Sequence, residues 1–326
     1  MALGGFFVVG IKDRGEISQE SIDFLKTYKP SGIIIFSHNI PDDYEATREF
    51  LHKIKGITGY GLYICVDQEG GRVMRIKPPF DFPSQREIGS LYERKVISDS
   101  DVFDLGQKVG SFLSYLGIDV NFSPCVDLYG YNFSVIGDRA YSDDPDIVAR
   151  IAEGFSKGML SSGVLPVAKH FPGHGLVEED SHHVLPYQKF SDVEKHIKPF
   201  KLVSSFVYGV MTAHIVVRDI DPDLPATLSS KTISLLKSFF PGCVITDDLG
   251  MKALESFGSI SDLALKSFEA GCDTLLVCKN DYNLLSKVIE DFSREIGKFP
   301  KERIQDSASR VAFLRFKRSF SRRKIL

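Results

Sequence analysis

The clearest chemistry in the sequence follows one predicted strand end. The apolar run 165–168 is typical of a buried strand, and Lys169 and His170 come directly after it. A Gly-His-Gly turn follows, and Asp180 and His182 then stand two residues apart. An aspartate beside a histidine fixes the imidazole tautomer and raises its basicity, as an acid–base pair requires. A polar loop with satisfied side chains is the alternative interpretation of this stretch alone.

Two further segments carry ionisable side chains that suit a binding or catalytic site. Asp67 and Arg75 bound a glycine-containing turn, and Arg139 lies on a long loop. Such groups make the several hydrogen bonds that a hydroxyl-rich ligand needs, although a surface ion-pair loop would look similar. Asp247 and Asp248 end another apolar run, where an acid can act as a nucleophile or a metal ligand. Strand alternation puts these two side chains on opposite faces without saying which one faces a pocket.

The elements that must position these residues recur regularly along the chain. Eight short apolar runs predict strands at 6–11, 32–36, 63–66, 119–123, 165–168, 210–214, 243–246 and 274–278. Helical patterning between and after them predicts helices at 18–27, 42–55, 101–116, 144–161, 191–206, 229–239, 261–269 and 280–295. This alternation predicts an α/β protein, a single-domain (β/α)8 TIM barrel over 1–326, with a doubly wound open sheet as runner-up.

In a barrel, all strand ends of one polarity share a rim, and active sites form there. Polar residues collect after the predicted strands: Asp67, Glu69, Asp127, Lys169, His170, His214, Asp247, Asp248, Lys279 and Asn280. Solvent exposure explains one or two such positions, but it explains so many sites less well. We therefore expect the candidate residues to meet in one pocket.

Composition narrows the possible functions. A net charge of −3 over 326 residues gives no support for bulk nucleic-acid binding. No apolar stretch approaches the ~20 residues of a membrane helix, and the first apolar run lacks the basic start of a secretory signal. The five cysteines are odd in number and lie mostly in apolar runs, which favours free thiols in a reducing compartment, the cytoplasm. The basic segment 310–326, after a final helix from about 301, is expected to be a solvated end.

Together these motifs resemble the glycoside hydrolase family 3 β-N-acetylglucosaminidases of the NagZ-like branch. The most specific match is Lys-His-Phe-Pro-Gly-His-Gly, 169–175, followed by Asp-Ser-His, 180–182. Further matching segments are 67–75, Arg139, 211–214, 225–229 and 246–251, so the resemblance runs from about 32 to about 280. One departure is Leu176-Val177, where many relatives carry Asp-Thr, and it leaves the spacing of Asp180 and His182 intact.

The resemblance implies a retaining hydrolase without a metal or other cofactor. Asp247 would be the nucleophile, and His182 the general acid/base with Asp180 as its partner. The residues expected to hold the sugar hydroxyls are Asp67, Arg75, Arg139, Lys169 and His170. The implied substrates are β-linked N-acetylglucosamine glycosides, either peptidoglycan fragments recycled in the cytoplasm or chito-oligosaccharides. We expect a monomer that binds neither nucleic acid nor membrane.

Three alternatives remain open from the sequence. A metal-dependent hydrolase on the same barrel would draw its ligands from His170, His174, His182, His183, His214 and Asp247, but Lys169 would place a cation beside the metal. A β-glucosidase of the same family is possible, although those enzymes usually carry an acid on a second domain. A phosphorylase is the third, because a neutral histidine base repels phosphate less than a carboxylate would.

Overall fold

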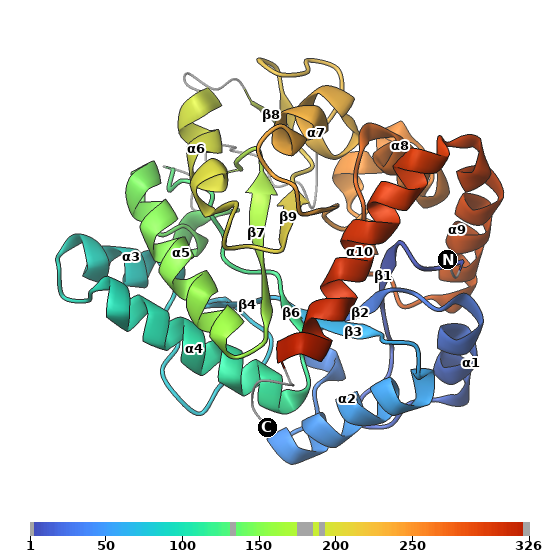
Figure 1. Ribbon diagram of the computed structural model, residues 1–326, viewed down its shortest axis with the longest axis horizontal. Coiled ribbons are helices and arrows are strands. Elements are labelled where there is room, and N and C mark those ends of the chain that lie inside the picture. The colour runs from blue at the N-terminus through green and yellow to red at the C-terminus, as the bar shows by residue number, and fades with distance from the viewer. Residues whose placement is uncertain (1–2, 131–134, 175–184, 189–192, 322–326) are drawn as a thin grey trace.

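The computed structural model describes residues 3–130, 135–174, 185–188 and 193–321 (Figure 1). Eight parallel strands form one sheet in the order β11-β9-β7-β6-β3-β2-β1-β12. Their bounds are β1 Phe7–Gly10, β2 Gly32–Ile35, β3 Tyr63–Val66, β6 Val120–Asn121, β7 Leu165–Phe171, β9 Gly209–Thr212, β11 Cys243–Ile245 and β12 Leu275–Val277. A parallel bridge between Ile245 and Thr274 joins the two outer strands, so the sheet closes. The predicted (β/α)8 barrel is confirmed, and each predicted strand is present.

The strands are buried on both faces, which is why they read as continuous apolar runs. Ile33, Ile34 and Ile35 of β2 are each no more than 1% exposed, although successive side chains point to opposite sides of the sheet. The side chains on one side of the sheet fill the barrel interior. Those on the other side pack against the surrounding helices, which encircle the strands in Figure 1. The core therefore occupies both the barrel interior and the layer between strands and helices.

All eight predicted helices are present. They are α1 Gln19–Tyr28, α2 Tyr44–Thr58, α4 Asp99–Leu116, α5 Pro145–Ser161, α6 Val193–Val203, α7 Ser230–Lys237, α8 Ile260–Ala270 and α9 Tyr282–Glu295. Capping explains where several of them begin. Ser98 and Ser259 each form a capping box, with Asp101 and Asp262 respectively, and so satisfy free N–H groups of the first turn.

Several elements were not predicted. Helix α3, Gln85–Glu93, contains Gly89, which weakens a helical pattern, yet a Cβ there would collide with the carbonyl oxygen of Tyr141. The additional strands form two small ribbons: β4 Gln68–Gly70 with β5 Val73–Met74, and β8 Tyr187–Gln188 with β10 Val216–Val217. Short 3-10 turns complete the set: η1 Ser37–Asn39, η2 Gly137–Arg139, η3 Ala226–Leu228, η4 Lys252–Phe257 and η5 Ile296–Lys298.

The last helix, α10 Lys301–Ser321, docks at the amino-terminal ends of β11 and β12. The fully buried Asp273 accepts hydrogen bonds from Arg303 at 3.2 Å, Arg310 at 3.3 Å and Lys237 at 3.2 Å. Arg310 therefore corrects the expectation of a solvated basic segment, because a buried carboxylate on the barrel attracts it.

Two composition-based expectations can be compared with the structure. The five cysteines are free thiols, as predicted. Within the described ranges, no helix combines the length and the apolar character needed to cross a membrane.

Candidate active site

The predicted binding residues meet in a cavity of about 360 Å³ at the carboxyl ends of the strands. Six of the eight predicted site residues line it: Asp67, Arg75, Arg139, Lys169, His170 and Asp247. The other two, Asp180 and His182, lie outside the described residues. The rest of the lining is Ile34, Phe36, Glu69, Val73, Phe122, Met211, Asp248, Met251, Leu276 and Cys278.

A buried network of alternating charges forms one side of this cavity. The Lys169 ammonium lies 2.7 Å from Asp67 Oδ1 and 2.5 Å from Glu69 Oε1. Arg139 binds Glu69 through two parallel hydrogen bonds, from Nε at 2.8 Å and Nη2 at 2.9 Å. Burial opposes ionisation of Glu69, but Arg139 and Lys169 outweigh it and lower its pKa to about 2. The network is therefore charged at neutral pH, and its oxygen and nitrogen atoms face the cavity as acceptors and donors.

The β4–β5 hairpin places Asp67, Glu69 and Arg75 around this network. Between the two acids, the buried Gln68 accepts the N–H groups of Arg75 and Ile76 at 3.0 and 3.1 Å and donates to the Ile76 carbonyl at 2.6 Å. Gly70 makes the turn with a φ of +94°, a conformation that other residues rarely adopt. One glutamine side chain thus closes the hairpin so that its flanking residues line the cavity.

Arg75 makes looser contacts than the other cations. Its Nη2 lies 3.4 Å from Asp67 Oδ2, and its guanidinium carbon lies 5.3 Å from the centre of the Phe36 ring. Nε has no hydrogen-bond partner among the described residues. A ligand hydroxyl can therefore bind Arg75 without displacing a strong ion pair.

Strand β7 differs from its prediction in a way that builds the site. The predicted strand ends at residue 168, whereas β7 continues to Phe171 because Lys169 bridges to Cys125 and Phe171 pairs with Thr212. The Lys169 backbone is therefore held by sheet hydrogen bonds to Pro124 and Val126 on the β6 side, and the His170 N–H donates to Asp127 Oδ2 at 3.1 Å. The Lys169 and His170 side chains are buried, 2% and 6% exposed, so their positions are fixed before any ligand binds.

The two acids after β11 have different surroundings. Asp247 Oδ1 accepts the N–H of Asp248 at 2.8 Å. Asp248 Oδ1 accepts two backbone N–H groups, of Gly250 and Cys278, each at 2.9 Å. Burial raises the pKa of Asp247, whereas the hydrogen bond from the Asp248 N–H and the nearby Lys169 ammonium lower it, and its pKa lies below the ordinary value. Asp247 is thus an ionised carboxylate in the cavity wall, and Asp248 is tied to the backbone.

His214 stabilises the segment that carries Asp247 and Asp248 through hydrogen bonds of its ring. It is fully buried, with Nδ1 2.8 Å from Thr227 Oγ1 and Nε2 2.9 Å from the carbonyl oxygen of Asp248. A carbonyl only accepts, so Nε2 carries the proton, and burial lowers the pKa of the ring so that it stays neutral. Both ring nitrogens are committed, which leaves neither for a metal.

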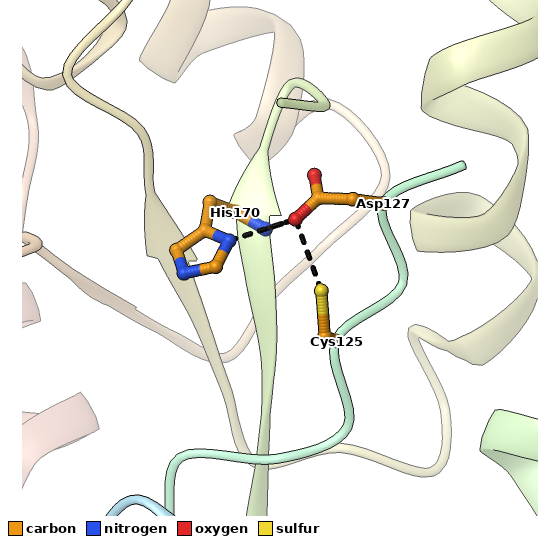
Figure 2. A group of neighbouring side chains, drawn as sticks. All are labelled: Cys125, Asp127 and His170. Atoms are coloured by element: carbon orange, nitrogen blue, oxygen red, sulfur yellow. Dashed lines mark hydrogen bonds and ion pairs between the residues drawn. The ribbon is translucent and has the colours of Figure 1, made fainter. Parts of the chain in front are cut away.

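One cluster in the described part of the chain has donor atoms close enough to hold a metal ion: Cys125, Asp127 and His170, all within 4.8 Å (Figure 2). Asp127 Oδ2 accepts from His170 Nδ1 at 2.7 Å and from Cys125 Sγ at 3.1 Å. Burial keeps the pKa of the thiol well above its ordinary value, and the Arg139 guanidinium lies 3.3 Å from the other ring nitrogen of His170. These groups satisfy one another as hydrogen-bond partners, and the adjacent cation opposes a metal.

The metal-hydrolase alternative needed a different set of ligands. Of its proposed ligands, His170, His174, His214 and Asp247 do not form a group with metal-binding spacing, and His182 and His183 lie outside the described residues. Sequence reasoning assigned no role to Glu69 or Asp127, although both stand at strand ends. The criterion that selected Asp67, a polar residue at the carboxyl end of a strand, applies equally to Glu69 and Asp127.

A parallel eight-stranded barrel with a charged cavity at its carboxyl rim is the architecture of a barrel enzyme whose active site lies at that rim. Residues 5–314 match the model of the glycosyl hydrolase family 3 N terminal domain. The chain belongs to glycosyl hydrolase family 3.

Relatives define the branch of the family. The chain is 34% identical over 283 residues to a beta-hexosaminidase of Nitrosomonas eutropha, covering 84% of this chain and 80% of that protein. A beta-hexosaminidase of Neisseria meningitidis serogroup B is 37% identical over 271 residues, covering 80% of this chain and 74% of that one. The predicted class, a glycoside hydrolase of the beta-hexosaminidase type, is confirmed.

Solved structures agree with this assignment. NagZ from Neisseria gonorrhoeae, in complex with N-trifluoroacetyl-D-glucosamine, superposes with a TM-score of 0.83 at 32% identity, over 95% of this chain and 90% of that one. A family 3 beta-N-acetylglucosaminidase from Paenibacillus gives 0.89 at 29% identity over 97% of this chain, which spans 62% of the length of that protein. The resemblance to the NagZ-like branch is thus confirmed at the level of the fold and the family.

Proposed function

We propose that this chain is a retaining β-N-acetylhexosaminidase that removes terminal N-acetylglucosamine from β-linked glycosides through a covalent glycosyl-enzyme. The observation that carries the proposal is the ionised Asp247 in the wall of a cavity that also holds the buried Asp67–Lys169–Glu69–Arg139 network. A retaining glycosidase needs a carboxylate that attacks the anomeric carbon while other groups hold the sugar. The lowered pKa of Asp247 keeps that carboxylate ionised and ready to attack.

In this proposal the sugar hydroxyls bind to Asp67, Arg75, Arg139, Lys169 and His170. The first four of these side chains supply charged hydrogen bonds, which are stronger than neutral ones. Because the network is already paired within the protein, it requires little reorganisation when the sugar arrives. Orientation of the ring against Asp247 then supplies part of the rate enhancement.

The acid/base role falls to His182, with Asp180 as its partner. In the first step Asp247 bonds to the anomeric carbon, the glycosidic bond breaks, and protonated His182 donates its proton to the leaving oxygen. In the second step neutral His182 takes a proton from water, the hydroxide displaces Asp247, and the sugar leaves with its configuration retained. The assignment rests on the sequence motif; the last described residue before that motif's Asp180 and His182 is His174, whose N–H donates to Asp127 Oδ1 at 2.6 Å.

The acetamido sugar is supported by the names of the relatives and by the N-trifluoroacetyl-D-glucosamine in the Neisseria gonorrhoeae complex. We infer that the natural substrates are peptidoglycan fragments, that the protein acts as a monomer in the cytoplasm, and that 1–326 works as one catalytic barrel. Each of these inferences could be wrong without affecting the proposed chemistry at the site.

The stereochemical outcome tests the proposal. Proton NMR of fresh reaction mixtures with an aryl β-N-acetylglucosaminide should show the β-anomer of the free sugar first and the α-anomer only after mutarotation. An initial α-anomer would overturn the covalent mechanism. A parallel reaction with EDTA should proceed at the same rate, whereas inactivation that added zinc reverses would support the metal-hydrolase alternative.

A further inference from the structure

We propose that Asp127 is a positioning residue that holds His170 in the tautomer with hydrogen on Nδ1, so that Nε2 offers a lone pair to a sugar hydroxyl. The inference rests on the proposed sugar-binding role of His170 and adds a residue to which the sequence assigned no role. Figure 2 shows the arrangement, with Asp127 on the segment after β6 and His170 on β7.

The sheet brings Asp127 to His170 through a short extension of β6. Cys125 forms a parallel bridge with Lys169, and the Val126 N–H donates to the Lys169 carbonyl at 2.8 Å. The Gln85 side chain, on α3, makes two hydrogen bonds to the Cys125 backbone: it accepts the N–H at 3.1 Å and donates to the carbonyl oxygen at 2.9 Å. The Asp127 carboxylate, two residues further on, is therefore held rigidly beside the His170 ring.

The positions of the protons follow from the partners. Burial opposes ionisation of Asp127, but hydrogen bonds from the His170 ring and from the His174 backbone N–H favour the ionised form, and its pKa lies far below the ordinary value, so the carboxylate only accepts. The His170 nitrogen that lies 2.7 Å away, Nδ1, must therefore carry hydrogen. On the opposite side Arg139 Nη2, which only donates, lies 3.3 Å from Nε2. A neutral ring with Nδ1–H satisfies both neighbours, and the long 3.3 Å contact from Arg139 is the one that a sugar hydroxyl donating to Nε2 would replace.

The other oxygen of Asp127 has a separate task. Oδ1 accepts the N–H of His174 at 2.6 Å, at the point where the glycine-flanked segment begins. Oδ2 accepts the backbone N–H of His170 at 3.1 Å in addition to the ring. Asn in place of Asp127 can keep the acceptor for His174 while presenting an NH₂ group to the His170 ring, at the cost of the hydrogen bond from the His170 backbone N–H. Asp127→Asn thus keeps the contact with the His174 backbone while changing the tautomer, whereas Asp127→Ala would remove every contact of this carboxylate.

In Asp127→Asn the new amide donates to His170 Nδ1, and the ring proton moves to Nε2. Nε2–H then faces the Arg139 N–H groups, and the cavity loses its acceptor for the sugar. Loss of one such hydrogen bond lowers kcat/KM on an aryl β-N-acetylglucosaminide roughly 10- to 100-fold. Cys125→Ser is the matched control, because it keeps a donor to the same carboxylate and leaves the His170 contact alone, so its loss should be several-fold smaller.

Two measurements test the proposal. Nitrogen-15 NMR of the imidazole rings in the parent protein, assigned with His170→Asn, should show His170 neutral with hydrogen on Nδ1, and in Asp127→Asn with hydrogen on Nε2. A hydrogen on Nε2 in the parent, or an unchanged tautomer in Asp127→Asn, would overturn the proposal without any activity data.

The second measurement uses aryl glycosides that lack one ring hydroxyl at a time. In the parent, one deoxy substrate should lose kcat/KM strongly, and in Asp127→Asn the same deletion should cost little, which a purely structural role of Asp127 would not produce. Equal penalties in both proteins would overturn the positioning role alone. If no deletion costs anything in the parent, the proposed sugar-binding role of His170 fails, and the tautomer then has no function in binding.

Discussion

Replacing Glu69 by Gln should destabilise the protein in a way that depends on pH. Glu69 is 1% exposed and lies between two cations, Lys169 at 2.5 Å and Arg139 at 2.8 Å. Glutamine has nearly the same shape but no charge, so both cations lose their buried counterion. Removing one partner of a buried ion pair costs about 3–5 kcal/mol.

The pKa of Glu69 gives a second measure of the same quantity. A shift from an ordinary 4.5 to about 2 corresponds to roughly 3 kcal/mol of stabilisation of the ionised form. Because the folded pKa is depressed, this stability is present above pH 4.5 and is lost as the pH falls towards 2. Once Glu69 is protonated it resembles glutamine, so the difference between the two proteins should shrink over this window.

Urea unfolding of both proteins at pH values from 7 down to 3 measures this difference. We expect about 3 kcal/mol at pH 7 and a progressively smaller value below pH 4.5. Glu153→Gln is the matched control, because Glu153 pairs with Lys157 one turn along α5 with both side chains more than one third exposed, and it should cost under about 0.5 kcal/mol at every pH. A loss for Glu69→Gln equal to that of the control, or one that does not change with pH, would refute the role given to the buried network.

The remaining predictions concern catalysis and the docking of α10. Asp247→Asn should lower kcat on the order of 1,000-fold or more in steady-state assays. Asp248→Asn should lower kcat less than about tenfold, because its amide oxygen still accepts two backbone N–H groups. Equal losses in the two variants would contradict the nucleophile assignment. His182→Ala should impair substrates with poor leaving groups far more than activated aryl glycosides, and a uniform loss across a leaving-group series would argue against its acid role. Asp273→Asn should lower the free energy of unfolding by about 3 kcal/mol because Lys237, Arg303 and Arg310 lose their buried counterion, while kcat of the folded enzyme stays near the parent value; an unchanged stability would contradict the docking of α10.

The sequence predicted the barrel because its signals are local. Strands buried on both faces read as apolar runs, as in β2, and helix starts carry capping residues such as Ser98 and Ser259. Helix α3 was missed because Gly89 weakens its pattern, and the reason for that glycine is a close approach to Tyr141, which is far away in the sequence.

The pattern of the sequence identified those site residues that directly follow a predicted strand. Asp67, Lys169 and Asp247 could be found because each stands where an apolar run stops. The pairings that give them their chemistry join distant positions: Glu69 with Arg139 across 70 residues, and Asp127 with His170 across 43. Such pairings depend on the register of neighbouring strands, which composition and periodicity do not contain.

The central claim is that Asp247 forms a covalent bond to the sugar. A 5-fluoro-N-acetylglucosaminyl fluoride should react quickly and release slowly, so the glycosyl-enzyme accumulates. Mass spectrometry of the digested protein should then place the label on the peptide that contains Asp247, and Asp247→Asn should remain unlabelled. A label on any other residue, or turnover in which no covalent adduct ever accumulates, would contradict the account.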